Sequence, residues 1–230
     1  MLGVVARPRA VLVKAQGHTE AGQNPEISYN ENTMQSPASP GKSHKHRVCP
    51  WWFGYLLLGP IRRLLHDPSS ILAPYLREGM TVLEPGPGMG FFTLELASRV
   101  GRSGHIIAVD VQPKMIERLK RRAANANLAE RIDARVTRAD SMQLDGLDSR
   151  VDFVLAFAAV HEMPDAAAFF AEAAAAMKPG ALMLLAEPSS QVSEAEFDTE
   201  LAMAKRVGLE AEARPPIRRA RAALLRKTQA

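Results

Sequence analysis

The sequence predicts an α/β fold: a doubly wound parallel sheet with helices on both faces. Apolar runs rich in β-branched residues, each with the length of a strand, occur at 80–84, 105–110, 134–139, 151–157 and 181–187. Helical patterns separate most of them, at 92–100, 113–125 and 165–177. Strands that alternate with helices at this spacing form βαβ units, whose parallel strands are covered on both faces.

The remaining elements flank this core. Asp67 and Pro68 suit the N-cap and the first turn of a helix over 70–77. A helix over 194–207 and two short segments, 209–213 and 219–225, end the chain. In the last segment, arginines alternate with small residues, which is typical of a strand at the edge of a sheet. The connection from 137 to 151 is irregular and shows no clear helix.

The amino-acid composition and the apolar pattern divide the chain into three parts. Residues 1–47 are rich in Pro, Ser, Asn and Gln without an apolar period, so we expect a disordered N-terminal extension. Its basic opening leaves a targeting signal open, and a true start at Met34 is an alternative. Residues 48–67 are expected to form an aromatic helix that is either a lid or ordinary core, and its aromatic residues are Trp51, Trp52, Phe53 and Tyr55. Residues 68–230 form the main domain.

The composition excludes several classes of protein. With 47% hydrophobic and 23% charged residues, the 230-residue chain can bury a core, but no apolar run approaches the ~20 residues of a membrane-spanning helix. The single cysteine, Cys49, excludes a disulfide framework and an all-cysteine metal site, and it fits a reducing compartment; we therefore expect a cytoplasmic protein. A net charge of +4 is too small to indicate nucleic-acid binding by itself.

The strongest motif stands where the first apolar strand meets a helix, and it reads Glu84-Pro85-Gly86-Pro87-Gly88-Met89-Gly90. Alternate glycines allow a tight turn and let a ligand lie against the main chain, at the sheet edge where ligands bind in this architecture. Phe91 occupies the third-glycine position of the dinucleotide pattern, and the Gly-Lys-Ser/Thr of a Walker loop is missing. Glycines with a purely structural role are the alternative.

Polar residues also follow the next three strands. Asp110 stands 20 residues after Gly90, the offset at which a carboxylate accepts hydrogen bonds from both ribose hydroxyls of an adenosine; a helix N-cap is the alternative. Asp140, followed by Ser141, could bind an adenine amine or stand in a solvated turn. Histidine side chains ordinarily titrate near neutral pH, which makes His161 a candidate base or acceptor-orienting group; the alternative is a loop histidine bonded to the backbone.

Together with Met177-Lys178-Pro179-Gly180 before the fifth strand, these motifs resemble class I S-adenosylmethionine-dependent methyltransferases over residues 68–190. The tail from residue 193 resembles the helix and terminal antiparallel hairpin of that Rossmann-like fold, which implies seven strands. Proline at two loop positions and Glu84 in place of the commoner Asp are departures from the family pattern.

The resemblance implies a role for each site residue. Glu84, Pro85, Pro87 and the three glycines would cradle the methionine part of the cofactor. Asp110, with Val111 beside it, would bind the ribose, and Asp140 with Ser141 the adenine. Phe157 would lie along the cofactor wall, and His161 would face the acceptor.

The resemblance further implies methylation of a small organic acceptor at oxygen, nitrogen or carbon, with S-adenosyl-L-methionine as cofactor and no metal. Such an enzyme mainly aligns the acceptor and excludes water, and it needs a base only where the acceptor loses a proton. The chain lacks the Asp/Asn-Pro-Pro-Tyr/Phe motif of adenine and glutamine methylation, and it has too few thiols for arsenite. Cys49 precedes the loop, which disfavours cytosine C5 transfer, and no convergent Asp/Asn set points to metal-assisted catechol transfer.

The partners we expect are a small-molecule acceptor and a second copy of the chain in a homodimer, with neither membrane nor nucleic acid. Three alternatives stay open. One is a non-catalytic S-adenosylmethionine-binding protein. Another is an RNA methyltransferase that uses the basic segments 114–122 and 218–227. The third is a nucleotide-linked oxidoreductase, which the missing third glycine disfavours.

Overall fold

The structure is a computed structural model that describes residues 66–229. The expectations for residues 1–47, for nearly all of the 48–67 segment with its four aromatic residues, and for Cys49 lie outside the described residues.

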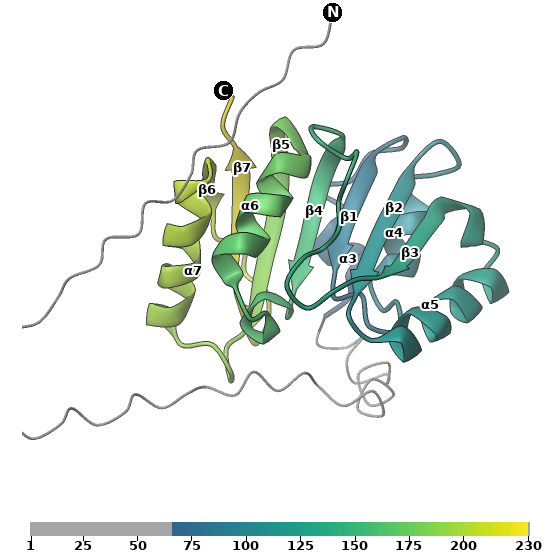
Figure 1. The fold of residues 1–230 in the computed structure, drawn as a ribbon, viewed down its shortest axis with the longest axis horizontal. Helices are drawn as coiled ribbons and strands as arrows, with labels where there is room; N and C mark the ends of the chain where they lie inside the picture. The colour runs from purple at the N-terminus through teal and green to yellow at the C-terminus, as the bar shows by residue number, and fades with distance from the viewer. Residues whose placement is uncertain (1–65, 230) are drawn as a thin grey trace, which may run out of the picture. The chain divides into compact units, whose positions relative to one another are not determined.

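One sheet of seven strands organises the described chain, with the order β3-β2-β1-β4-β5-β7-β6 (Figure 1). The first five strands run parallel, and β7 runs antiparallel to both of its neighbours. The strands are β1 (Thr81–Pro85), β2 (His105–Asp110), β3 (Ile132–Val136), β4 (Val151–Phe157), β5 (Met177–Pro188), β6 (Leu209–Ala213) and β7 (Ala220–Lys227). The predicted mostly parallel sheet with antiparallel terminal strands is thereby confirmed.

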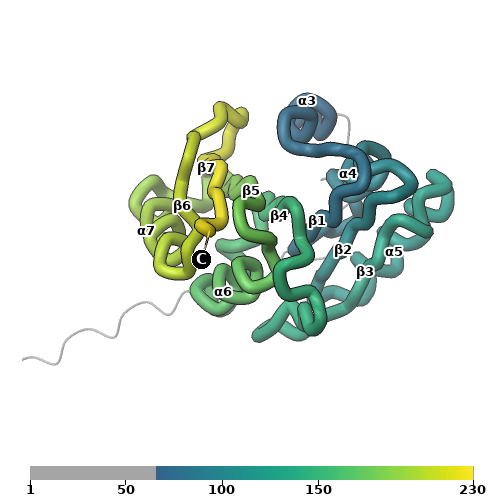
Figure 2. The backbone as a smooth tube through the Cα atoms, turned by 90° about the horizontal axis from the view of Figure 1, so that it is seen from above, coloured from purple at the N-terminus to yellow at the C-terminus, as the bar shows by residue number. Residues whose placement is uncertain are grey.

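Helices cover both faces of the sheet, as Figure 2 shows from above. The residues packed on one face come from α3 (Pro68–Leu72), α4 (Thr93–Arg99) and α5 (Pro113–Asn125). Those on the other face come from α6 (Ala166–Ala176) and α7 (Glu194–Arg206). Neighbouring strand residues such as Val82 and Leu83 belong to different cores, because successive side chains of a strand point to opposite faces. Two short 3₁₀ turns, η1 (Ala129–Arg131) and η2 (Val160–Glu162), complete the elements.

Several element boundaries differ from the prediction. Strand β3 spans 132–136 rather than 134–139, so Asp140 lies four residues beyond its end. Two further differences have local reasons. Helix α3 begins as expected, because the carboxylate of Asp67 accepts hydrogen bonds from Ser69 N (3.3 Å) and Ser70 N (3.1 Å). It ends at Leu72 rather than 77, since Pro74 has no N–H to continue the helical bonds. Strand β5 begins at Met177 rather than 181, because Met177 pairs with Val151 across a register shift in β4.

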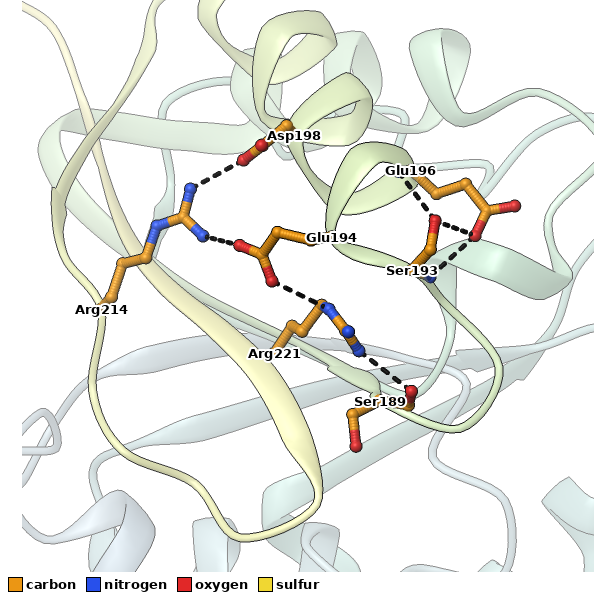
Figure 3. A network of polar contacts seen from close by, with 7 residues as sticks. All are labelled: Ser189, Ser193, Glu194, Glu196, Asp198, Arg214 and Arg221. Carbon is orange, nitrogen blue, oxygen red and sulfur yellow. Dashed lines mark hydrogen bonds and ion pairs between the residues drawn. The ribbon is translucent and has the colours of Figure 1, made fainter.

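The prediction that the last segment is an edge strand is wrong. β7 lies between β5 and β6, so β6 is the edge. Acids of neighbouring elements bind the side chains of Arg221 and Arg226 on β7, and Figure 3 shows the contacts of Arg221. Arg221 Nε bonds to Glu194 Oε2 (3.0 Å) at the start of α7, and Arg226 Nη2 bonds to Glu212 Oε2 (2.9 Å) on β6. Arg214 joins the same network through Glu194 (2.7 Å).

The connection from β3 to β4 contains no helix, as expected from its irregular sequence. Glu172 of α6 anchors it by accepting a hydrogen bond from Met142 N (2.8 Å). Leu144 and Leu147 pack beside Met142 against the core on the α6 and α7 face. Among residues 66–229, none of the helices has the length and apolarity needed to cross a membrane.

Candidate functional site

The glycine loop connects β1 to α4 at the carboxyl edge of the sheet. Gly86 N donates to Val109 O (2.9 Å) and Gly90 N to Pro87 O (3.0 Å), so the loop is anchored to β2 and closed by a turn. Gly88 has a φ of +55°, and a Cβ built on it would meet no atom of residues 66–229 within 4 Å. Within this part of the chain, the main chain at Gly88 therefore borders open space.

Gly86 and Gly90 are glycines for packing reasons. Their φ angles are +65° and +83°. A Cβ on Gly90 would stand 2.5 Å from Leu119 Cδ1, and one on Gly86 would stand 3.1 Å from the Cβ of Ala159. The structural alternative thus accounts for these two positions, whereas Gly88 has no such neighbour.

Asp110 closes β2 directly beside this loop. Its carboxylate accepts hydrogen bonds from Gln112 N (2.8 Å) and from Gly88 N (3.3 Å). Burial raises the pKa of Asp110 to about 6, although the backbone donors Gln112, Gly88 and Val111 act in the opposite direction. The N-cap of α5 is Gln112, so Asp110 does not cap that helix. The carboxylate instead joins the end of β2 to the open position at Gly88.

Two exposed apolar side chains stand next to Asp110. Val111 follows it in the chain and is 39% exposed, and Val136 pairs with Asp110 in the β2–β3 register and is 48% exposed. Both stand at carboxyl ends of neighbouring strands. This edge therefore offers an apolar surface beside a carboxylate, which suits a flat heterocycle joined to a sugar.

The other residues predicted to bind the cofactor differ in their exposure to solvent. Glu84 is buried at the end of β1, with 3% of its surface exposed. Phe157 is buried at the end of β4. The centroid of its ring lies 4.5 Å from that of Phe92 and 5.1 Å from that of His66. Asp140 is exposed, and its carboxylate binds Arg138 at 2.8 and 2.6 Å. Ser141 Oγ donates to Glu172 (3.3 Å) rather than standing free.

His161 lies in the turn after β4, where a buried carboxylate binds it. Its Nδ1 is hydrogen-bonded to Glu187 Oε2, and its Nε2 is buried, 4.0 Å from Glu162 Oε1. Burial lowers the pKa of His161, but the hydrogen bond and charge of Glu187 outweigh it and hold the pKa above the ordinary value. His161 is therefore hydrogen-bonded to a side chain, that of Glu187, and not to the backbone as the alternative reading expected.

Sequence reasoning missed Glu187 and Glu200. Glu187 ends β5 and is fully buried, and Glu200 lies on the inner side of α7 with 8% exposed. Burial raises the pKa of Glu200 to about 8, and the charge of Glu187 adds to this rise. A signal for Glu187 was present, because Glu187-Pro188 ends an apolar strand as Glu84-Pro85 does. Among residues 66–229, no cluster of His, Cys, Asp or Glu is arranged to hold a metal ion.

Known proteins resemble the chain both in sequence and in structure. The chain is 30% identical over 137 residues to an arsenite methyltransferase of Halobacterium salinarum, covering 60% of this chain and 33% of that protein. It is 32% identical over 143 residues to a ubiquinone biosynthesis O-methyltransferase of Methylocella silvestris, covering 61% and 53%. The chain spans between a third and about half the length of these curated relatives.

A solved structure has the same fold. The S-adenosylmethionine-dependent methyltransferase of Aquifex aeolicus superposes with a TM-score of 0.70 over 79% of this chain and 100% of that chain, at 24% identity. Residues 76–219 match the family described as a methyltransferase domain. The glycine loop, the carboxylate that ends β2 and the strands β1 to β6 lie in this matched range, and β7 follows it directly. The chain belongs to the methyltransferase-domain family, with the fold of class I S-adenosylmethionine-dependent methyltransferases.

Proposed function

We propose that this protein transfers a methyl group from S-adenosyl-L-methionine to a small organic acceptor. The observation that carries the proposal is the arrangement of Gly88 and Asp110. An open stretch of main chain with positive φ adjoins a buried carboxylate at hydrogen-bond distance, and an exposed valine follows that carboxylate. These residues fit the three parts of the cofactor, namely its amino-acid chain, its ribose and its adenine.

The residues would divide the work along the cofactor. Asp110 would accept hydrogen bonds from the ribose hydroxyls, and Val111 would pack against the adenine. The loop from Glu84 through Pro85, Gly86, Pro87 and Gly88 to Gly90 would hold the methionine part. Asp140 and Ser141 would bind the adenine edge once Asp140 exchanges its pair with Arg138, and Phe157 would back the cofactor from the end of β4.

The chemistry needs little beyond this positioning. When bound, the cofactor supplies a methyl group already activated by a sulfonium. The protein's residues would hold the acceptor in line with that methyl group and exclude water. His161 would accept or orient a proton of the acceptor through Nε2, which requires a side-chain movement in the turn because Nε2 is covered.

The relatives support a small acceptor. Their names refer to arsenite, ubiquinone biosynthesis and demethylrifamycin. The sequence contains one cysteine, which disfavours arsenite for this chain and leaves organic acceptors. We further propose a cytoplasmic location, which the single cysteine supports.

Calorimetric titration with S-adenosylmethionine, S-adenosylhomocysteine and NADH tests the cofactor. We expect the two adenosyl-sulfur compounds to bind and NADH not to bind; the reverse result would overturn the proposal. Incubation of cell extract with isotopically labelled cofactor, followed by mass spectrometry, tests transfer and identifies the acceptor. Binding without any labelled product would favour the non-catalytic alternative, and label in RNA would favour the RNA methyltransferase.

The variant His161→Ala tests the base. We expect turnover to fall at least about tenfold, because a positioned proton acceptor contributes at least that much, while cofactor affinity stays the same. Unchanged turnover would remove His161 from the mechanism and leave the cofactor assignment intact.

A further inference from the structure

The buried carboxylate of Glu187 takes part in three hydrogen bonds with the turn after β4. Oε1 accepts from Val160 N (2.9 Å) and Ala159 N (3.3 Å), and Oε2 is bonded to His161 Nδ1. The side chain of Glu187 is fully buried. Glu187 comes from β5, whereas its partners follow β4, so the carboxylate joins the ends of two neighbouring strands.

The turn that Glu187 holds has a strained backbone and adjoins the glycine loop. Ala158 has a φ of +54°, a conformation that residues with a Cβ rarely adopt, and its N–H bonds to Ala186 O (2.7 Å). Next to it, Ala159 packs against Gly86 of the glycine loop. The same short turn thus bonds to the carboxylate of Glu187 and neighbours the glycine loop.

The charges around His161 come from every side of this turn. Oε1 of Glu162 in η2 is 4.0 Å from His161 Nε2, and Gln191, which follows β5, adds to the rise in the pKa of His161. Helix α7 adds the charge interactions of Glu200 and Glu196 with this cluster. Because burial raises the pKa of Glu200 to about 8, this acid is neutral at neutral pH, and Glu187 is the charged partner that acts most strongly on His161.

We propose that Glu187 is a positioning residue of this site: its carboxylate holds the turn at 158–161 against the glycine loop and fixes the ring of His161 through Nδ1. The cofactor cradle and the acceptor-side histidine would then depend on one side chain that touches neither cofactor nor acceptor. The inference rests on the proposed function, because that function gives the glycine loop and His161 their roles. The contacts of Glu187 can nevertheless be tested without measuring methyl transfer.

Two substitutions separate the carboxylate's charge from its geometry. Glu187→Gln keeps an oxygen that can accept from Val160 N and Ala159 N but removes the charge. Glu187→Ala removes every hydrogen bond. Glu200→Gln is the matched control, because it changes a buried acid beside the same cluster without touching the turn.

The first measurement is the NMR titration of His161, assigned by the signal that His161→Gln lacks. In Glu187→Gln we expect the pKa of His161 to fall below that of the unsubstituted protein and its tautomer to change, because an amide cannot stabilise the imidazolium as a carboxylate does. Glu200→Gln should leave both unchanged at pH values well below 8, where Glu200 is protonated. An unshifted titration in Glu187→Gln would overturn the proposal.

The second measurement is the affinity for S-adenosylhomocysteine by calorimetry. We expect Glu187→Gln to stay within about threefold, whereas Glu187→Ala should weaken binding about tenfold or more, the usual effect of losing buried hydrogen bonds. Unchanged affinity in a folded Glu187→Ala would refute the link to the glycine loop. Should that variant not fold, the titration of Glu187→Gln still decides the matter. Absence of binding by the unsubstituted protein would instead refute the proposed function.

Discussion

Ala159, in the turn after β4, lies against Gly86 of the glycine loop, so that a Cβ on Gly86 would stand 3.1 Å from the Cβ of Ala159. The two residues belong to loops after neighbouring strands, since β1 pairs with β4 in the sheet. A side chain at Gly86 would therefore press on the turn after β4, because protein interiors pack at crystal-like density and leave little room for added atoms. The glycine loop and this turn are neighbours at one edge of the sheet.

The open position at Gly88 gives a direct prediction. Gly88 and Gly146 both have positive φ (+55° and +75°), and in the described part of the chain a Cβ at either would meet no atom within 4 Å. Alanine at either position should therefore cost about 1–2 kcal/mol of backbone strain. The Tm should fall by a similar number of degrees in the two variants. Only Gly88→Ala should weaken cofactor affinity, by at least about tenfold, because only its Cβ would enter the cofactor's space. Equal affinities of the two variants in calorimetry would contradict this assignment.

The carboxyl of Asp110 predicts how cofactor binding depends on pH. Burial raises its pKa to about 6, and the repulsion of Glu162 adds to the rise. In the proposed role, the ionised form would accept hydrogen bonds from both ribose hydroxyls, so affinity should be constant above pH 6 and fall by up to about tenfold per pH unit below it. Asp110→Asn should bind more weakly and lose this dependence. A binding constant that does not change through pH 6 would exclude Asp110 from ribose recognition.

The sequence predicts well what local patterns determine. The bounds of His105–Asp110, Val151–Phe157 and Pro113–Asn125 agree with prediction because apolar runs and a proline at the first helical turn mark them. The glycine loop and Asp110 are likewise readable, since turn chemistry and strand ends are local features. Their assembly at one edge follows from the parallel sheet.

Contacts between distant segments could not be predicted in the same way. The pair of Glu187 and His161 depends on which strands are neighbours and on their register, and neither leaves a local signal. Glu200 reads as one of several acids on a solvated helix face, and only the packing of α7 shows that it is buried. β7 reads as an edge strand because the acids that bind its arginines lie elsewhere in the chain.

Glu200 predicts how stability depends on pH. Its folded-state pKa of about 8 lies above the ordinary 4.5, so the folded protein binds this proton more tightly than the unfolded chain does. Its contribution to stability is complete below pH 4.5 and is lost as pH rises toward 8. Glu200→Gln, which cannot ionise, should raise the free energy of unfolding above pH 8 by about 1 kcal/mol, a value reduced for residual solvent contact.

Chemical denaturation of both proteins at two pH values measures this effect. Glu210 on the exposed part of β6 supplies the control, because Glu210→Gln removes an acid that is not buried. Its substitution should leave the pH dependence of unfolding unchanged. Parallel curves for the unsubstituted protein and Glu200→Gln would show that Glu200 stays charged in the folded state.

The pair of Asp140 and Arg138 gives the last prediction. Both side chains are 67% exposed, and solvent screening makes such a pair easy to exchange for another partner. If Asp140 binds the adenine amine, Arg138→Ala should raise cofactor affinity severalfold because the competing guanidinium is gone, and Asp140→Ala should lower it. Asp133 and Arg135 have the same two-residue spacing on β3 and serve as the control. Arg135→Ala should leave the affinity unchanged, since no cofactor contact is proposed for that pair. Calorimetry on the three variants decides, and an Asp140→Ala variant with unchanged affinity would limit adenine recognition to Val111 and its neighbours.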